Sequence, residues 1–225
     1  MTAKRLGMVV IGQSPRPDVE AQMRALVGDD VEIVLRGALD GMSRAEIDAL
    51  RPSDGMDTLF TRLPPDNAAV TLSKHVVEGR AKLALTRMRG EGMTVTMLCC
   101  TGHFPALDGD GLVVLPSAVL AGMIDGLLPR GRLGMLLPLP EQTEQLAAKW
   151  RRPGLEVFAV PLIPGADDAA IDAAAAAIDG AAPDLVVMDC MSYTKAMKDR
   201  VRLTVRAPVI LSVAAVARVV GELLA

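Results

Sequence analysis

The sequence predicts an α/β fold of two pseudo-symmetric lobes, each a mostly parallel sheet flanked by helices. Short apolar runs alternate with amphipathic segments of helical length along nearly all of the 225 residues. This alternation is typical of parallel sheets that helices cover on both faces. Hydrophobic residues make up 51% of the chain and aromatic residues only 2%, so aliphatic side chains must build the core.

Strands and helices are predicted in turn from the N-terminus onward. Strands are expected at 8–11, 31–35, 94–99, 111–115, 132–137, 156–160, 184–190 and 208–212. Helices are expected at 17–28, from 43, and at 73–88, 117–128, 141–150, 167–179 and 194–204, with a last one after 212. Local signals support several boundaries: Pro17 suits a first helical turn, Gly28 a helix end, and Ser43 with Glu46 a capping box.

A weak internal symmetry suggests the two lobes. Each half begins with an apolar strand, a proline-bearing loop and a helix, and each later has an apolar strand that ends in cysteine. The first half is longer between these features, and the charged segment 36–65 accounts for the excess. The boundary is therefore expected near 105–115, with the two lobes facing each other.

Charge and composition exclude several classes of protein. The net charge is -3 with no Lys/Arg run, which gives no signal for nucleic acid. No apolar run reaches the roughly 20 residues of a membrane helix, and the N-terminal apolar run is too short for a signal peptide. Three cysteines without paired spacing argue against a disulfide framework, so a cytoplasmic location is expected.

Candidate site residues lie where predicted parallel strands end, because ligands gather at the carboxyl ends of such strands. All three cysteines are at these ends: Cys99, Cys100 and Cys190. If the lobes face each other, the expected site is the cleft between them, with a cysteine from each lobe. No nucleotide-binding glycine motif and no metal-ligand spacing occurs, so neither a cofactor nor a metal is expected.

The loops at these strand ends, which surround the cysteines, suit a small anion such as a carboxylate. Ser14, Thr101, Ser192 and Thr194 supply hydroxyl groups, and Arg16 is a charge partner. Backbone N–H groups at the helix starts that follow can bind an anion and also favour a thiolate.

A simpler interpretation is that these cysteines are small buried residues of the core. Strand alternation allows only one of Cys99 and Cys100 to face a given side, and the residues alone leave the choice open. A further alternative is a cysteine hydrolase that pairs Cys100 with His103, although no third orienting group is evident.

Several segments together resemble the AroM family. They are I-G-Q-S-P-R-P-D, L-R-G-A-L-D-G-M-S-R-A-E-I, L-C-C-T-G, L-P-L-P-E-Q-T-E-Q-L-A-A-K-W, D-L-V-V-M-D-C-M-S-Y-T and A-P-V-I-L-S-V-A-A-V-A-R. The resemblance runs essentially from end to end. The family name by itself implies no reaction.

The two cysteine segments are also similar, more distantly, to those of the aspartate/glutamate racemase superfamily, whose signatures are C-N-T-[AS] and G-C-T-[HE]. Cys99 fits the reactive position of the first signature best, and a shift by one nominates Cys100. The second segment keeps only Cys190 and departs from the signature with Met191 and Ser192. By this resemblance the lobes are 1–107 with 208–225, and 108–207.

The resemblance implies a cofactor-independent racemase or isomerase that acts on a small carboxylate by cysteine acid–base chemistry, either with two cysteines in racemisation or with one in a related isomerisation or decarboxylation. Cys99 and Cys190 are the implied catalytic residues. The implied substrate-binding residues are Gln13, Ser14, Arg16, Cys100, Thr101, Gly102, Ser192, Tyr193 and Thr194. The alternative is a non-catalytic protein of the same fold that binds a small anion. A homodimer is also suggested, since the racemases are often dimers.

Overall fold

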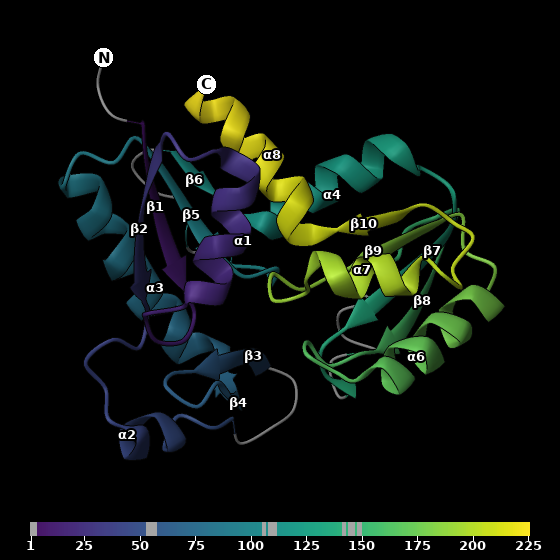
Figure 1. Cartoon of the computed structure of the whole chain (residues 1–225), viewed down its shortest axis with the longest axis horizontal. Helices are drawn as coiled ribbons and strands as arrows, with labels where there is room; N and C mark the ends of the chain where they lie inside the picture. The colour runs from purple at the N-terminus through teal and green to yellow at the C-terminus, as the bar shows by residue number, and fades with distance from the viewer. Residues whose placement is uncertain are drawn as a thin grey trace. The chain divides into compact units, whose positions relative to one another are not determined.

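The computed structural model describes residues 4–52, 58–104, 107, 112–140, 143, 147 and 150–225 (Figure 1). The chain divides into two compact units, the first comprising Met1–Ser117 with Val216–Ala225 and the second Ala118–Ala215. Each unit contains a four-stranded parallel sheet with helices packed on it. The predicted α/β fold of two lobes is confirmed.

The sheet of the first unit has the strand order β2-β1-β5-β6, and all its neighbouring strands are parallel. The strands are β1 (Lys4–Val10), β2 (Val31–Gly37), β5 (Val95–Cys99) and β6 (Leu112–Val114). At one edge of this sheet Val10 is in register with both Gly37 and Cys99. The loops that follow β1, β2 and β5 therefore leave the sheet side by side.

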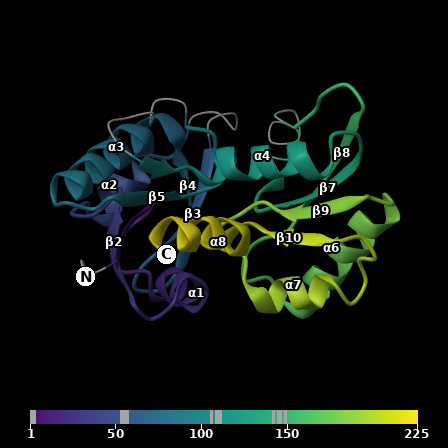
Figure 2. The ribbon, with the colours of Figure 1, turned by 90° about the horizontal axis from the view of Figure 1, so that it is seen from above.

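Helices α1 (Pro17–Val27) and α3 (Lys74–Gly90) lie on opposite faces of this sheet (Figure 2). Pro17 opens α1, and Gly28, at φ +102°, follows its last residue, as the sequence predicts. On the α3 side, Gly7 of β1 lets the helix approach closely, because a Cβ there would lie 3.0 Å from the sulfur of Met88.

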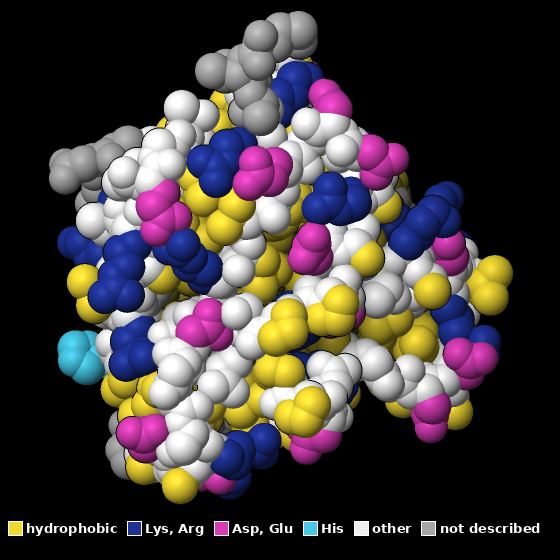
Figure 3. Space-filling model, turned by 60° about the vertical axis from the view of Figure 1, so that its left-hand side comes forward, with side chains coloured by type: hydrophobic (Ala, Val, Ile, Leu, Met, Phe, Trp, Pro, Cys, Tyr) yellow, Lys and Arg dark blue, Asp and Glu magenta, His cyan; other side chains and the backbone are white. Residues whose placement is uncertain are grey.

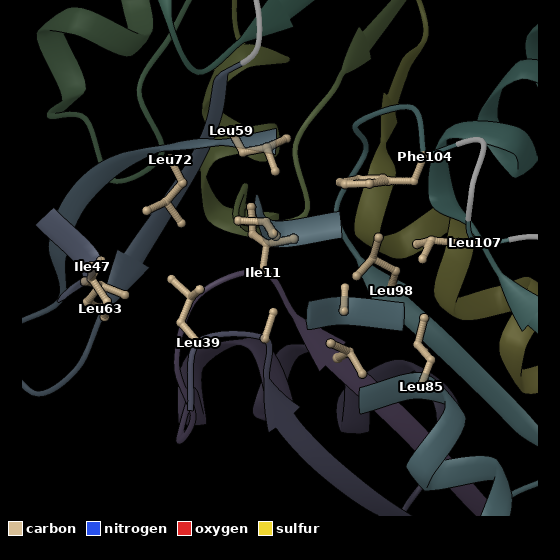
Figure 4. Packing of buried hydrophobic residues seen from close by; sticks show 14 of the residues in the cluster. Ile11, Leu39, Ile47, Leu59, Leu63, Leu72, Leu85, Leu98, Phe104 and Leu107 are labelled. Atoms are coloured by element: carbon tan, nitrogen blue, oxygen red, sulfur yellow. The ribbon is translucent and has the colours of Figure 1, made fainter. Parts of the chain in front are cut away.

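An insertion follows β2 and was not predicted as a sheet. It holds the short helix α2 (Arg44–Asp48) and an antiparallel pair, β3 (Thr58–Leu63) with β4 (Ala68–Ser73). The capping box predicted for Ser43 and Glu46 is present at the start of α2. Figure 4 shows Leu59 and Leu72 of the hairpin in one core cluster with Ile11, so the insertion packs onto the end of the first sheet.

The second unit repeats the topology of the first with the strand order β10-β9-β7-β8. Its strands are β7 (Gly131–Leu137), β8 (Leu155–Pro161), β9 (Leu185–Met188) and β10 (Val209–Leu211). Its helices are the greater part of α4 (Pro116–Leu127), α6 (Asp168–Gly180), α7 (Lys195–Val201) and the first residues of α8 (Ser212–Leu224). Thus β7, β8, β9 and β10 correspond to β1, β2, β5 and β6.

The boundaries of the two units differ from those of the expected lobes at both places where the chain passes from one unit to the other. The expectation assigns 208–225 to the first lobe, whereas β10 pairs with β9 and keeps 208–215 in the second unit. It also assigns 108–117 to the second lobe, whereas β6 pairs with β5 and keeps 112–117 in the first unit. The predicted helix 141–150 lies largely outside the described residues.

The surface carries interspersed charges, as Figure 3 shows for one face, where Lys and Arg side chains alternate with Asp and Glu. Within the described ranges, no helix combines the length and apolar character needed to cross a bilayer.

Candidate active site

The loop after β1 is fastened to the turn after β2 by Asp40. One carboxylate oxygen of Asp40 accepts a hydrogen bond from the Ser14 amide at 2.7 Å. The other accepts from Ser14 Oγ at 2.8 Å and from the Gly37 amide at 2.7 Å. Gln13 donates from Nε2 to the carbonyls of Leu39 and Met42. Gln13 and Ser14, both predicted to bind substrate, thus also hold their own loop in place.

Arg16, in the same loop, is a buried cation with only 4% of its surface exposed. Its guanidinium donates two hydrogen bonds to the carboxylate of Asp18, at 2.8 and 2.7 Å, and one to the carbonyl of Arg62. The hydrogen bond from Arg16 holds the pKa of Asp18 below its usual value. The structure therefore fixes the position of this positive charge.

Cys99, the last residue of β5, is buried. Its neighbour Leu98 belongs to the core cluster that includes residues of α3, so alternation along the strand turns Cys99 to the opposite face. Burial raises the pKa of the Cys99 thiol far above its usual value, the neighbouring Cys100 raises it further, and the charge of Arg16 opposes this only in part. Cys99 is thus a neutral thiol at physiological pH.

Cys100 begins a tight turn beyond the strand and is half-buried. Its amide donates to the carbonyl of Leu98 at 2.9 Å, and its sulfur accepts a hydrogen bond from the Gly102 amide at 3.3 Å. Gly102 is closely surrounded, since a Cβ there would lie 3.0 Å from the Phe104 ring. Thr101 between them is buried, whereas His103 is exposed.

Cys190 lies in a turn of the same form after β9. Its amide donates to the carbonyl of Met188 at 3.0 Å, and its sulfur accepts from the Ser192 amide at 3.5 Å. Asp189, before it, is buried, and the amide of Asp189 donates to the carbonyl of Leu136. The strand ends two residues earlier than predicted, so Cys190 lies in a loop and not in the sheet.

Tyr193 and Thr194 complete this loop with structural contacts. The Tyr193 hydroxyl is fully buried and donates to the carbonyl of Leu162. Burial raises the pKa of Tyr193 well above its usual value, and the nearby Cys190 and Asp189 add to the effect. Thr194 caps α7 by accepting from the Met197 amide.

The two units can be aligned residue by residue through their first strands. Residues 5–8 and 132–135 both read R-L-G-M. The arginine of each strand forms an ion pair with a glutamate in the adjacent strand, Arg5 with Glu32 and Arg132 with Glu156. The alignment thus holds for sequence, strand pairing and surface contacts.

This alignment makes Cys100 the counterpart of Cys190. Val9 of β1 is in register with Leu98, and the equivalent Leu136 of β7 is in register with Met188. Counting on from Leu98 and Met188, Cys99 corresponds to Asp189 and Cys100 to Cys190. Both members of the first pair are buried and both members of the second are half-buried. The repeat therefore favours Cys100 over Cys99 as the site-facing residue.

Each unit brings its own predicted site residues to the carboxyl edge of its sheet. In the first unit the β1 and β5 loops are neighbours, since Val10 pairs with Cys99. In the second unit the loop after β9 brings Cys190, Ser192, Tyr193 and Thr194 together. Asp40, which fastens the β1 loop, was missed by sequence analysis. Its only local signal is the turn-forming dipeptide Asp40-Gly41, which indicates a turn but no partner.

No cluster of three or more His, Cys, Asp or Glu side chains with metal-binding geometry occurs in the part of the chain that the structure describes. Thiols, hydroxyl groups and backbone amides lie at these strand ends, together with the buried side chain of Asp189.

Comparisons with known proteins agree with this fold. The model of the family described as AroM protein matches residues 6–224. A search of curated proteins finds no match. Among solved structures, an arylmalonate decarboxylase is 16% identical with a TM-score of 0.65, covering 98% of this chain and 92% of its own.

Two further solved structures share the fold. The maleate isomerase from Pseudomonas putida S16 is 16% identical with a TM-score of 0.61, and the match covers 95% of this chain and 89% of that one. The aspartate racemase from Picrophilus torridus is 13% identical with a TM-score of 0.59, and the match covers 98% and 94%.

Proposed function

Because the chain belongs to the AroM family and shares its fold with racemases, isomerases and decarboxylases, we propose that it is a cofactor-independent racemase or isomerase. Its substrate is a small carboxylate, and its acid–base groups are cysteine thiols. The observation that carries the proposal is the repeated turn in which the sulfurs of Cys100 and Cys190 each accept a backbone hydrogen bond.

The repeated turn suits thiolate chemistry. A hydrogen bond donated to a sulfur favours its charged form, so the Gly102 and Ser192 amides lower the energy of the two thiolates. The thiolate is the reactive form of cysteine. Cys99 has the opposite environment, because its burial favours the neutral thiol. The proposal therefore uses Cys100 in place of Cys99.

The proposed reaction moves one proton off a carbon and another onto it. A thiolate removes the proton next to the carboxylate, and the electron pair of that C–H bond moves into the carboxylate as an enediolate. The other thiol then delivers a proton to the same carbon from the opposite face, so no electrons are gained or lost overall. Such an acid–base pair contributes on the order of 10²–10⁴ in rate.

Charge develops on the carboxylate oxygens during this reaction, and preorganised donors must stabilise it. We assign this role to hydroxyl and amide groups of the predicted binding loops, chiefly Thr101, Ser192 and Thr194. One such donor is worth roughly 3 kcal/mol when it is removed. Arg16 holds the first loop in place, because its guanidinium forms an ion pair with Asp18 and donates to the carbonyl of Arg62.

The test is exchange of substrate hydrogen with deuterated water, followed by proton NMR over a panel of small amino, hydroxy and aryl-substituted carboxylates. The proposal predicts exchange with at least one of them. Cys100→Ala and Cys190→Ala are each expected to lower its rate by on the order of 10²-fold or more. Cys99→Ala is the matched control and is expected to retain exchange.

Absence of exchange across the panel, together with saturable binding of one of its members, would overturn the enzyme proposal in favour of a non-catalytic carboxylate-binding protein. Exchange that survives both Cys100→Ala and Cys190→Ala would instead reject these two thiols as the acid–base groups.

A further inference from the structure

The first unit has a separate cavity of about 310 Å³ between the end of β2 and helix α3. Its lining contains one arginine from β2, two arginines and two apolar side chains from α3, and the turn after β2. The lining residues are Arg36, Gly37, Ala38, Asp40, Arg80, Leu83, Ala84 and Arg87. None of the cysteines or predicted substrate-binding residues is among them.

One wall of this cavity is a single face of helix α3. Arg80, Leu83, Ala84 and Arg87 recur at i, i+3, i+4 and i+7, which places all four on one face of α3. The two arginines are two turns apart, about 10 Å along the helix axis. Between them, Leu83 and Ala84 form an apolar surface, and Leu83 is 60% exposed.

The three arginines differ in how many hydrogen bonds their guanidinium groups already form within the protein. Arg36 forms two hydrogen bonds with Glu91, at 2.9 and 2.8 Å. Arg80 donates from Nε to the carbonyl of Ala38 at 2.7 Å, and from Nη2 to the carbonyl of Asp40 at 3.4 Å. The Arg87 side chain is exposed, and its guanidinium forms no hydrogen bond or ion pair within the described part of the chain, although its carbonyl accepts from the Glu91 amide. Arg80 is thus oriented by the protein, and Arg87 is available to a ligand.

The unpaired guanidinium group of Arg87 is the feature of the cavity that favours an anion. Asp40 is the one acidic residue of the lining, and its oxygens accept from Ser14 and Gly37. Asp40, Glu91 beside Arg36 and Glu46 near Arg80 offset the arginine charges, and Arg87 is the arginine of the lining whose guanidinium forms no ion pair among the described residues. The planar guanidinium group binds carboxylate or phosphate oxygens through paired hydrogen bonds.

We propose that this cavity binds a small phosphate monoester. A phosphate group offers three oxygens, one more acceptor than a carboxylate, to Arg87 and to the N–H groups of Arg80 that its two backbone contacts leave free. The volume exceeds what a phosphate group needs and lies at the lower end of the range for small-ligand sites. Leu83 and Ala84 provide an apolar surface for the organic part of the ligand.

The bound ligand would also touch the segment that holds the β1 loop. Arg80 donates to the carbonyls of Ala38 and Asp40, and the carboxylate of Asp40 holds Ser14. Occupancy is therefore expected to slow hydrogen exchange of the Ser14 and Gly37 amides. This effect concerns binding and local stability alone, and it does not depend on the proposed reaction.

The experiment is a calorimetric titration with phenyl phosphate as the probe, at constant ionic strength set with sodium chloride, compared with benzoate. We expect saturable binding of phenyl phosphate and at least tenfold weaker binding of benzoate. Arg87→Gln removes one charge-assisted contact and is expected to weaken binding by about tenfold or more. The matched control is Arg89→Gln, on the same helix but outside the cavity, and its effect is expected to be under about twofold.

Three outcomes would overturn the proposal. They are no saturable binding of phenyl phosphate to the wild-type protein, equal weakening by Arg87→Gln and Arg89→Gln, and equal affinity for benzoate and phenyl phosphate. Equal weakening would mean that binding reflects only the general charge of the helix. Because no turnover is measured, each outcome is independent of whether the hydrogen-exchange reaction above is found.

Discussion

Cys100 and Cys190 occupy equivalent positions in the two units. In each turn the cysteine amide donates to the carbonyl two residues before it, and the cysteine sulfur accepts from the amide two residues after it. The preceding residue is buried in both units, as Cys99 in one and as Asp189 in the other. The proposed chemistry depends on this repeated geometry.

The buried thiol of Cys99 predicts a loss of stability at high pH. Its pKa is raised in the folded protein, so its contribution to stability is complete below the pKa of the unfolded thiol, about 8.5, and is lost above it. The loss approaches about 1.4 kcal/mol per pH unit. The raised pKa of Tyr193 has a similar effect above the unfolded pKa of tyrosine, about 10. Tyr193 is present in both the wild type and the Cys99→Ala variant, so its effect cancels when their stabilities are compared.

Urea unfolding of the wild type and of Cys99→Ala at pH 7, 8.5 and 9.5 measures this contribution. We expect the stability difference between them to change by about 1 kcal/mol between pH 8.5 and 9.5, to the disadvantage of the wild type. A difference that stays constant over this range would contradict a raised pKa of Cys99.

Asp40 is expected to stabilise the first unit through its three accepted hydrogen bonds. Asp40→Asn keeps one oxygen but turns an amide group toward N–H donors, which leaves at least one of them without an acceptor. We expect a loss of about 1–3 kcal/mol in the free energy of unfolding by urea. Asp29→Asn, at an exposed position, is the control, and equal effects of the two substitutions would be inconsistent with this role.

Gly7 of β1 and Gly134 of β7 occupy equivalent positions in the two units, so the same substitution can be compared at both. A Cβ on Gly134 would lie 2.9 Å from Cγ1 of Ile178, whereas one on Gly7 would lie 2.8 Å from the sulfur of Met93. The Ile side chain is branched and stiff, whereas the Met thioether moves easily. We therefore expect Gly134→Ala to lower the stability by about 1–3 kcal/mol and Gly7→Ala to lower it by less. Thermal unfolding measures both.

The control for this pair is Gly122→Ala in α4, where a Cβ meets nothing within 4 Å and helix propensity favours alanine. This substitution is expected to be neutral or stabilising. A larger loss at Gly7 than at Gly134 would argue against the close approach of α6 to β7.

Much of the fold could be predicted because strands buried on both faces are continuous apolar runs. The run before Cys99 and the helix that starts after Ser73 are where the sequence places them. The hairpin β3–β4 was missed, because it belongs to an insertion that lies outside the repeating strand–helix pattern. Its pairing is a tertiary feature that local periodicity does not report.

The choice between Cys99 and Cys100 needed strand register. Alternation alone says that only one of them faces a given side, and the family signature favours Cys99. The R-L-G-M repeat is visible in the sequence, but it reaches the cysteines only through the pairing of Val9 with Leu98 and of Leu136 with Met188. That pairing joins segments about 90 residues apart in the first unit, so only the structure supplies it.

The most direct test of the equivalence of Cys100 and Cys190 is the rate at which each cysteine reacts with iodoacetamide in the native protein at pH 8. Fragment-ion mass spectrometry resolves Cys99 from Cys100, and the same reaction in urea gives the unprotected rates. We predict that Cys100 and Cys190 react, and that Cys99 reacts at least about tenfold more slowly until the protein is unfolded. Fast native modification of Cys99 with Cys100 protected would contradict the assignment of Cys100 as the counterpart of Cys190.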